Sequence, residues 1–161
     1  MDVNIPLSES TLFPRGEKVP EAFSKYFIGV KYFKELTTPD SPLNCGIGIV
    51  TFEPGCRTDW HAHPTGEFLL ITDGRGWYQE EGKTARELHA GDVVEIPPNV
   101  KHWQGAAADS WFIYLAIDPD VTLGPPIWFE PVTDEEYILL KSLNHHQALI
   151  HGLDCRRGTQ T

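Results

Sequence analysis

Residues 55–74, GCRTDWHAHPTGEFLLITDG, bring two histidines and a glutamate close together in the chain. Side chains of a β-strand alternate between two faces, so His61 and His63 are expected to project to the same side. Glu67 follows the Pro64-Thr65-Gly66 bend, and a bend of that length can return the carboxylate to the same interior. The stretch therefore predicts a pair of chelating imidazoles with a carboxylate beside it.

A fourth candidate ligand lies further along the chain. In IPPNVKHW (96–103), two prolines stiffen the approach to a predicted strand that starts at His102. Three imidazoles and one carboxylate offer the mixture of nitrogen and oxygen donors that suits Mn, Fe, Co, Ni or Zn. An isolated His-x-His can be a chance pair on a solvated strand, but here two further ligands accompany it. We therefore expect one divalent metal ion per chain, with open positions for water or substrate, held by His61, His63, Glu67 and His102.

Short apolar segments separated by turn residues run from 46 to 117, with no helical repeat between them. This rhythm predicts an all-β fold, as an antiparallel sandwich or barrel. The EEGKT turn (80–84) fits a hairpin in which Gly82 takes a positive φ angle, so the flanking segments should pair. Ahead of this region, YFIGVKYFKEL (26–36) alternates in the manner of a strand.

The C-terminal region has a different composition. A proline-rich connector begins at residue 118, and Thr133 and Glu136 then stand at the spacing of a helical capping box. We expect a single domain, 1–161, made of a barrel core at about 45–117, a connector and short helix at 118–146 and a tail at 147–161.

Composition and charge exclude several classes of partner. The 161 residues include 13 Lys and Arg against 23 Asp and Glu, for a formal net charge of −10. Such a charge repels nucleic-acid phosphates and acidic membrane surfaces, so neither partner is expected. The chain has no apolar run long enough for a membrane span and no signal-peptide pattern, which predicts a cytoplasmic protein. Cys45, Cys56 and Cys155 show no C-x-x-C spacing and are expected to be reduced.

The region from 45 to 117 resembles the two signature motifs of the cupin superfamily. The first motif, G(x)5HxH(x)3-4E(x)6G, is matched at every fixed position by Gly55, His61, His63, Glu67 and Gly74. The second, G(x)5PxG(x)2H(x)3N, is matched at three positions, by Gly91, Pro97 and His102. Asn99 replaces its second glycine and Ala106 its final asparagine, and Asn tolerates the left-handed conformation that the glycine would supply.

This resemblance implies a β-barrel of the jelly-roll type with the metal inside it. It also implies a homodimer, because cupin barrels commonly pair through their sheets or exchange N-terminal strands. The apolar alternation in KYFIGVKYF (25–33) is the sequence feature that fits such an edge.

A narrower similarity connects the chain to small bacterial single-domain cupins that include the manganese-dependent hydroxynitrile lyases of the cupin type. In those lyases, Gln, His and His stand at the positions of Glu67, Gln104 and Tyr114. Compared with those lyases, this chain is expected to keep the scaffold and the metal but to lack the groups that would transfer protons. Gln104 and Tyr114 are the expected catalytic residues here, because they follow His102 closely on predicted strands.

Alternation does not decide every inward-facing side chain. From His102 it sends Gln104 inward. On the strand GWYQE (76–80), either Trp77 or Tyr78 could face the interior. On SWFIYLAI the choice lies between two alternating sets, Trp111, Ile113 and Leu115 or Phe112, Tyr114 and Ala116.

These observations favour a small-molecule enzyme in which the metal acts as a Lewis acid on a carbonyl or hydroxyl oxygen, in lyase or isomerase chemistry. Two alternatives use the same ligands. One is an Fe(II)-dependent oxygenase with three histidines and one glutamate, and the other is a non-catalytic cupin that binds a small ligand or serves as an accessory protein. The substrate is not specified by the sequence.

Overall fold

The computed structural model describes residues 12–140, which are mostly β-strand, and the expected all-β class is confirmed. The chain divides into two compact units, Met1–Pro131 and Val132–Thr161. The expectation that both belong to one domain stays a prediction. Within the part that the structure describes, no helix has the length and apolar character that crossing a bilayer requires.

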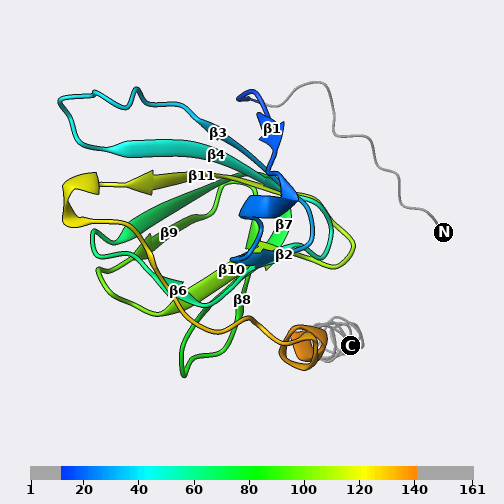
Figure 1. The fold of residues 1–161 in the computed structure, drawn as a ribbon. Helices are drawn as coiled ribbons and strands as arrows, with labels where there is room; N and C mark the ends of the chain where they lie inside the picture. The colour runs from blue at the N-terminus through cyan, green and yellow to red at the C-terminus, as the bar shows by residue number, and fades with distance from the viewer. Residues whose placement is uncertain (1–11, 141–161) are drawn as a thin grey trace, which may run out of the picture. The chain divides into compact units, whose positions relative to one another are not determined.

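The first unit is built on one twelve-stranded sheet in which every strand pair is antiparallel. Its main path runs β1-β3-β4-β11-β7-β10-β5-β2, and β3, β4 and β11 lie side by side at the top of Figure 1. Two short 3-10 helices accompany the sheet, η1 (Glu21–Phe23) and η2 (Val121–Leu123). The strands are β1 (Glu17–Lys18), β2 (Phe27–Ile28), β3 (Lys31–Glu35), β4 (Gly46–Phe52), β5 (Arg57–Thr58), β6 (His61–Ala62), β7 (Glu67–Glu80), β8 (Arg86–His89), β9 (Val93–Ile96), β10 (His102–Ala106), β11 (Phe112–Asp118) and β12 (Ile127–Trp128).

The long strand β7 makes the sheet curl. Its first half pairs with β11 and β9, and its second half pairs with β10 and β8. The two halves meet at Gly74, which has a φ of 74°. A Cβ at this position would lie 1.8 Å from the carbonyl oxygen of Trp111, so the bend requires glycine.

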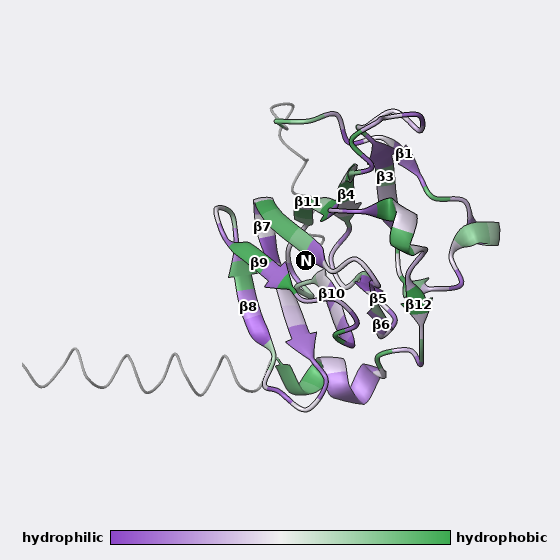
Figure 2. Cartoon of the chain, turned by 90° about the vertical axis from the view of Figure 1, so that its left-hand side faces the viewer, coloured by the Kyte–Doolittle hydropathy of each residue, from purple (hydrophilic) through white to green (hydrophobic). Residues whose placement is uncertain are grey.

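The curled sheet packs its apolar face into one core. Hydrophobic and hydrophilic residues follow one another along β7, β8 and β9 in Figure 2, as expected for strands with one buried face. The interior choices that alternation left open are resolved in favour of Tyr78 and of the set that contains Tyr114. The buried core cluster comprises Val50, Phe52, Cys56, Leu69, Ile71, Tyr78, Leu88, Val94, Ile96, Ala106, Phe112 and Tyr114.

Two local predictions about turns are confirmed. Gly82 has a φ of 75°, and the segments that flank its hairpin pair as β7 and β8. Asn99, at the position of a motif glycine, has a φ of 63° and so adopts the left-handed conformation itself.

One other prediction is wrong. The expected strand over 26–36 is interrupted at Gly29, which has a φ of 99° where the chain passes from β2, paired with β5, to β3, paired with β4. Within the connector after residue 118, the structure forms β12, which pairs with β6.

The second unit begins with the predicted capping box. The backbone N–H of Thr133 donates to a Glu136 carboxylate oxygen at 2.8 Å, and the backbone N–H of Glu136 donates to Thr133 Oγ1 at 3.2 Å. The helix that follows occupies 134–140 within the described residues. The rest of the predicted helix, the tail and Cys155 lie outside them.

Gly74→Ala is expected to destabilise the protein much more than Gly82→Ala. Both glycines have a positive φ, so each alanine carries a conformational penalty of about 1–2 kcal/mol. No atom lies within 4 Å of a Cβ at Gly82, whereas Gly74→Ala adds a collision with the backbone of Trp111 and about 1–3 kcal/mol more. Urea denaturation of the two metal-free variants measures the difference, and equal midpoints would contradict this account of the bend.

Candidate metal centre

Four side chains that are far apart in the sequence meet inside the curled sheet. His61 lies on β6, His63 follows directly after it, and Glu67 and His102 are the first residues of β7 and β10. Pairing of β6 with β10 sets His102 directly opposite His61. One ligand atom from each of the four residues lies within 4.8 Å of all the others, and all four side chains are buried. The structure therefore brings together the complete predicted ligand set.

Backbone carbonyls orient two of the imidazoles. His61 Nδ1 lies 2.9 Å from the carbonyl oxygen of Asp59, and His102 Nδ1 lies 2.8 Å from that of Val100. A carbonyl oxygen can only accept, so each Nδ1 carries the hydrogen and each Nε2 keeps a lone pair. This is the arrangement that fixes the tautomer of metal-binding histidines.

A carboxylate orients the third imidazole. His63 Nδ1 lies 2.9 Å from Asp118 Oδ1, at the end of β11, and His63 Nε2 lies 3.2 Å from Glu67 Oε2. Nothing in the local sequence of Asp118 connects it with a histidine 55 positions earlier, so its role could not be predicted from sequence. Only the pairing of β11 with β7 brings that strand to the cluster.

The atoms at the centre of the cluster fit a cation. Glu67 Oε2 and His102 Nε2 are 3.4 Å apart, and both are acceptors in the tautomer just described. Within the described residues neither atom makes a hydrogen bond, although a protonated His63 would place a donor, Nε2, 3.2 Å from Glu67 Oε2. Two buried acceptors that face each other are unfavourable unless a positive charge lies between them. The mixed nitrogen and oxygen set can hold a divalent metal ion of the first transition series.

The pKa values of two ligands are shifted in opposite directions. Burial holds the pKa of His61 well below its usual value, with a smaller contribution from the charge of His102. Burial also acts to lower the pKa of His63, but the hydrogen bond to Asp118 and the charge of Glu67 outweigh it and raise the pKa. Without a metal, His61 is therefore neutral and ready to bind, whereas His63 tends to hold a proton.

Aromatic rings of the proline-rich connector and of the N-terminal region stack beside the cluster. The ring of Trp128, on β12, stacks on His61 with centroids 4.6 Å apart. The ring of Tyr26 stacks on the other side of Trp128 at 4.5 Å and 5°. Because these contacts depend on the pairing of β12 with β6, composition alone could not indicate them.

The two expected catalytic residues lie next to each other in the same interior. Gln104 is 3% exposed and Tyr114 is 2% exposed. Gln104 Nε2 donates to Tyr114 Oη at 3.2 Å, and Gln104 Oε1 has no hydrogen-bond partner within the described residues. Burial, together with the charge of Glu67, raises the pKa of Tyr114 well above its usual value. The phenol is therefore a neutral hydrogen-bonding group at ordinary pH.

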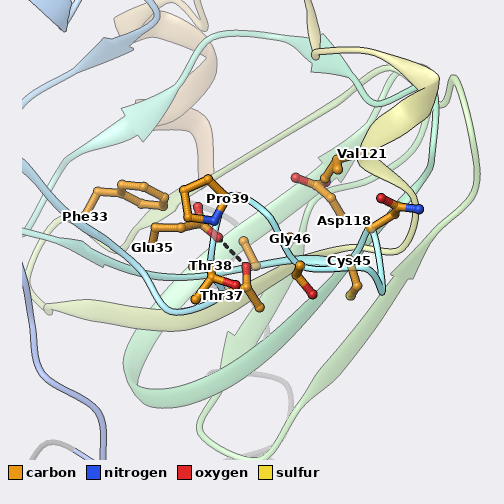
Figure 3. A pocket seen from close by; sticks show the side chains of 13 residues that line it. Phe33, Glu35, Thr37, Thr38, Pro39, Cys45, Gly46, Asp118 and Val121 are labelled. Atoms are coloured by element: carbon orange, nitrogen blue, oxygen red, sulfur yellow. Dashed lines mark hydrogen bonds between the residues drawn. The ribbon is translucent and has the colours of Figure 1, made fainter.

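A cavity of about 360 Å³ is lined by residues of β3, β4 and β11, among them Asp118, but not by any of the four cluster residues. Figure 3 shows Phe33 and Glu35 at one end of its lining and Asp118 and Val121 at the other. Asp118 borders the cavity and also contacts His63, so it connects the two. Volumes of about 300–1,000 Å³ are usual for small-molecule sites, and this cavity lies at the small end.

Comparisons with known proteins agree with this geometry. A family model described as a cupin domain matches residues 48–118, which include all four ligands, Gln104 and Tyr114. An (R)-mandelonitrile lyase from Granulicella tundricola is 48% identical over 99 residues, which make up 62% of this chain and 75% of that protein.

Solved structures show the same fold. A cupin-like protein from Thermotoga maritima is 47% identical, covers 80% of this chain and 95% of its own, and superposes with a TM-score of 0.74. The DMSP lyase DddQ from Ruegeria pomeroyi is 22% identical over 72% of this chain and 58% of its own, with a TM-score of 0.57. At that identity the second match supports the fold alone.

Affinity for a divalent metal should fall as the pH drops through the raised pKa of His63. A proton on His63 occupies the nitrogen that a metal would use, so the metal must displace it. Zinc affinity is expected to be full above that pKa and to fall by roughly tenfold per pH unit below it. Competition with a chelating dye between about pH 5 and 8 measures the profile.

Asp118→Asn tests the cause of this profile. Loss of the carboxylate lowers the pKa of His63, so the fall in affinity should move to lower pH. Asp109→Asn is the matched control, because Asp109 is an exposed carboxylate that pairs with Arg75. A profile that stays unchanged in Asp118→Asn, or that shifts equally in both variants, would contradict the assignment.

Proposed function

The chain belongs to the cupin family, and from this membership we propose that it is a divalent-metal-dependent enzyme of the lyase or isomerase type acting on a small molecule. The observation that carries the proposal is the approach of Glu67 Oε2 and His102 Nε2, two acceptors with no hydrogen bond within the described residues, in a buried cluster whose neighbour Asp118 lines a cavity. A purely structural polar cluster would satisfy these atoms with hydrogen bonds. Homodimer formation and a cytoplasmic location stay predictions.

The proposed metal ligands are His61, His63, Glu67 and His102. A divalent metal ion bound there supplies Lewis-acid stabilisation of the negative charge that develops on a substrate oxygen. The carbonyls of Asp59 and Val100 and the carboxylate of Asp118 keep the imidazoles in place, so the site requires little rearrangement. The native metal is one of Mn, Fe, Co, Ni and Zn.

Gln104 and Tyr114 are proposed to orient the substrate. Tyr114 Oη accepts a hydrogen bond from Gln104, which leaves its own O–H to donate to a substrate oxygen. Gln104 Oε1 remains as an acceptor for a substrate hydroxyl or N–H group. Since the pKa of Tyr114 is raised, the phenol acts as a hydrogen-bond donor and not as the base. Together the two side chains present one donor and one acceptor in a place from which water is largely excluded.

The cavity beside Asp118 is the proposed substrate site. Glu35 and several hydroxyl groups line it together with the ring of Phe33, so it can bind a compound with both apolar and polar parts. The (R)-mandelonitrile lyase relative supports the lyase class, and mandelonitrile is therefore the first compound to assay.

His61→Ala should abolish both metal binding and turnover, because it removes a ligand from the centre. Zinc affinity is expected to fall by more than roughly a hundredfold, which exceeds the usual effect of losing an outer hydrogen-bond partner. His89→Ala is the control, since His89 is an exposed histidine outside the cluster. Metal analysis of protein purified without chelators, followed by assays in air and under nitrogen, provides the measurement.

Three outcomes of that assay separate the possible functions. Cleavage or isomerisation under nitrogen with Mn or Zn supports the proposal. Oxygen uptake that requires Fe(II) would replace it with an oxygenase. Loss of stability on chelation, with no turnover on any compound tested, would indicate a non-catalytic binding protein.

Tyr114→Phe should lower kcat/KM by roughly ten- to a hundredfold while leaving zinc affinity unchanged, because it removes the hydrogen bonds of the hydroxyl to the substrate and to Gln104 but no metal ligand. Tyr32→Phe is the matched control. Its hydroxyl bonds to Glu53 and its side chain projects from the other face of β3. Equal activity of Tyr114→Phe and wild type would remove Tyr114 from the proposed mechanism.

A further inference from the structure

Lys31, the first residue of β3, extends into the interior that holds the ligand cluster. It pairs in register with Phe52, and antiparallel partners project to the same face. Phe52 is fully buried and meets the ring of Tyr114 edge-on, with centroids 5.7 Å apart. Lys31 Nζ lies 5.5 Å from the ring centroid of Phe27 and 5.7 Å from that of Phe33. The sequence analysis did not single out this lysine.

The ammonium group of Lys31 has aromatic neighbours but no carboxylate partner. Among the ion pairs of residues 12–140, none includes Lys31. Burial lowers the pKa of Lys31, and the charges of Cys56 and Glu67 only partly oppose this effect. A partly buried cation of this kind is stabilised when an anion binds next to it.

The charge of Lys31 acts on the ligand cluster from β3. It interacts electrostatically with Glu67 and contributes to the low pKa of His61. The carboxylates of Glu67 and Asp118 together would balance the charge of a divalent metal ion bound by the cluster. The positive charge of Lys31 is additional to that balance, and no ion pair among the described residues offsets it.

We propose that Lys31 is a substrate-binding residue that receives the carboxylate of a small hydroxy acid. The hydroxyl of the same substrate then lies toward the ligand cluster, where Gln104 Oε1 offers an unused acceptor. The inference rests on the proposed function, since it names the substrate class of the same site.

The charges in the cavity determine which way such a substrate lies. Glu35 and Asp118 line the cavity and repel a carboxylate from that region. Phe33 borders the cavity (Figure 3), and its ring also lies beside Lys31 Nζ. The acid is therefore held with its carboxylate at Lys31 and its neutral portion along Phe33 and the cavity.

Calorimetric titration with mandelate and mandelamide tests the proposal. The two probes have nearly the same shape, and only mandelate is an anion. Wild-type protein should bind mandelate roughly tenfold to a hundredfold more tightly than mandelamide, as expected for a hydrogen-bonded charge pair. Lys31→Met should abolish this preference, and Lys31→Arg should retain most of it. Lys34→Met is the control, because Lys34 is an exposed lysine on the same strand and the opposite face.

Each result either supports or overturns the role of Lys31. A wild-type protein that does not prefer mandelate, or a Lys31→Met variant that keeps the preference, overturns it. If Lys31→Met does not fold by circular dichroism, Lys31→Gln removes the same charge with a polar side chain and is judged by the same criterion.

Zinc affinity separates this proposal from the proposed function. Lys31 is not a ligand and repels cations, so Lys31→Met should bind zinc at least as tightly as wild type. Failure of the wild-type protein to bind zinc would overturn the metal-dependent function. The preference for mandelate in zinc-free protein would still decide whether Lys31 receives a carboxylate.

Discussion

The close approach of Glu67 Oε2 and His102 Nε2, at 3.4 Å, is the constraint on which the site depends. Within the described residues both atoms are acceptors that make no hydrogen bond, and both side chains are almost fully buried. Such a pair is unfavourable in a protein interior, because each group loses its hydration and neither can donate to the other. The barrel interior is therefore arranged for a cation, and a proton on His63 partly fills that place when no metal is bound.

The curl of the sheet makes this approach possible. Glu67 begins β7 and His102 begins β10, and the bend at Gly74 lets one strand pair with both β11 and β10. Pairing of β11 with the first half of β7 brings Asp118 from the end of β11 to His63. Orientation of the ligands is thus a property of strand pairing, and a change at Gly74 is expected to disturb the site as well as the stability of the fold.

Three groups other than the ligands give the interior its chemical character. Gln104 and Tyr114 form a neutral pair with one acceptor and one donor unused, whereas Lys31 brings a positive charge from β3. The proposed substrate, a small hydroxy acid, matches this combination because it carries an anion and a hydroxyl group. Its carboxylate is excluded from the part of the cavity that Glu35 and Asp118 border.

The sequence by itself predicted the four candidate ligands, which the structure brings together, as well as the all-β class and the local turns. The spacing of His61, His63 and Glu67 predicts that they share one face, because strand alternation and a short bend are local rules that act over a few residues. Only the tertiary structure placed Asp118 and Trp128 against the cluster and Lys31 on the interior face of β3, and decided which of the neighbouring aromatic residues face inward. These positions depend on pairing between strands distant in sequence, and a strand shifted by one residue would point every side chain to the other face.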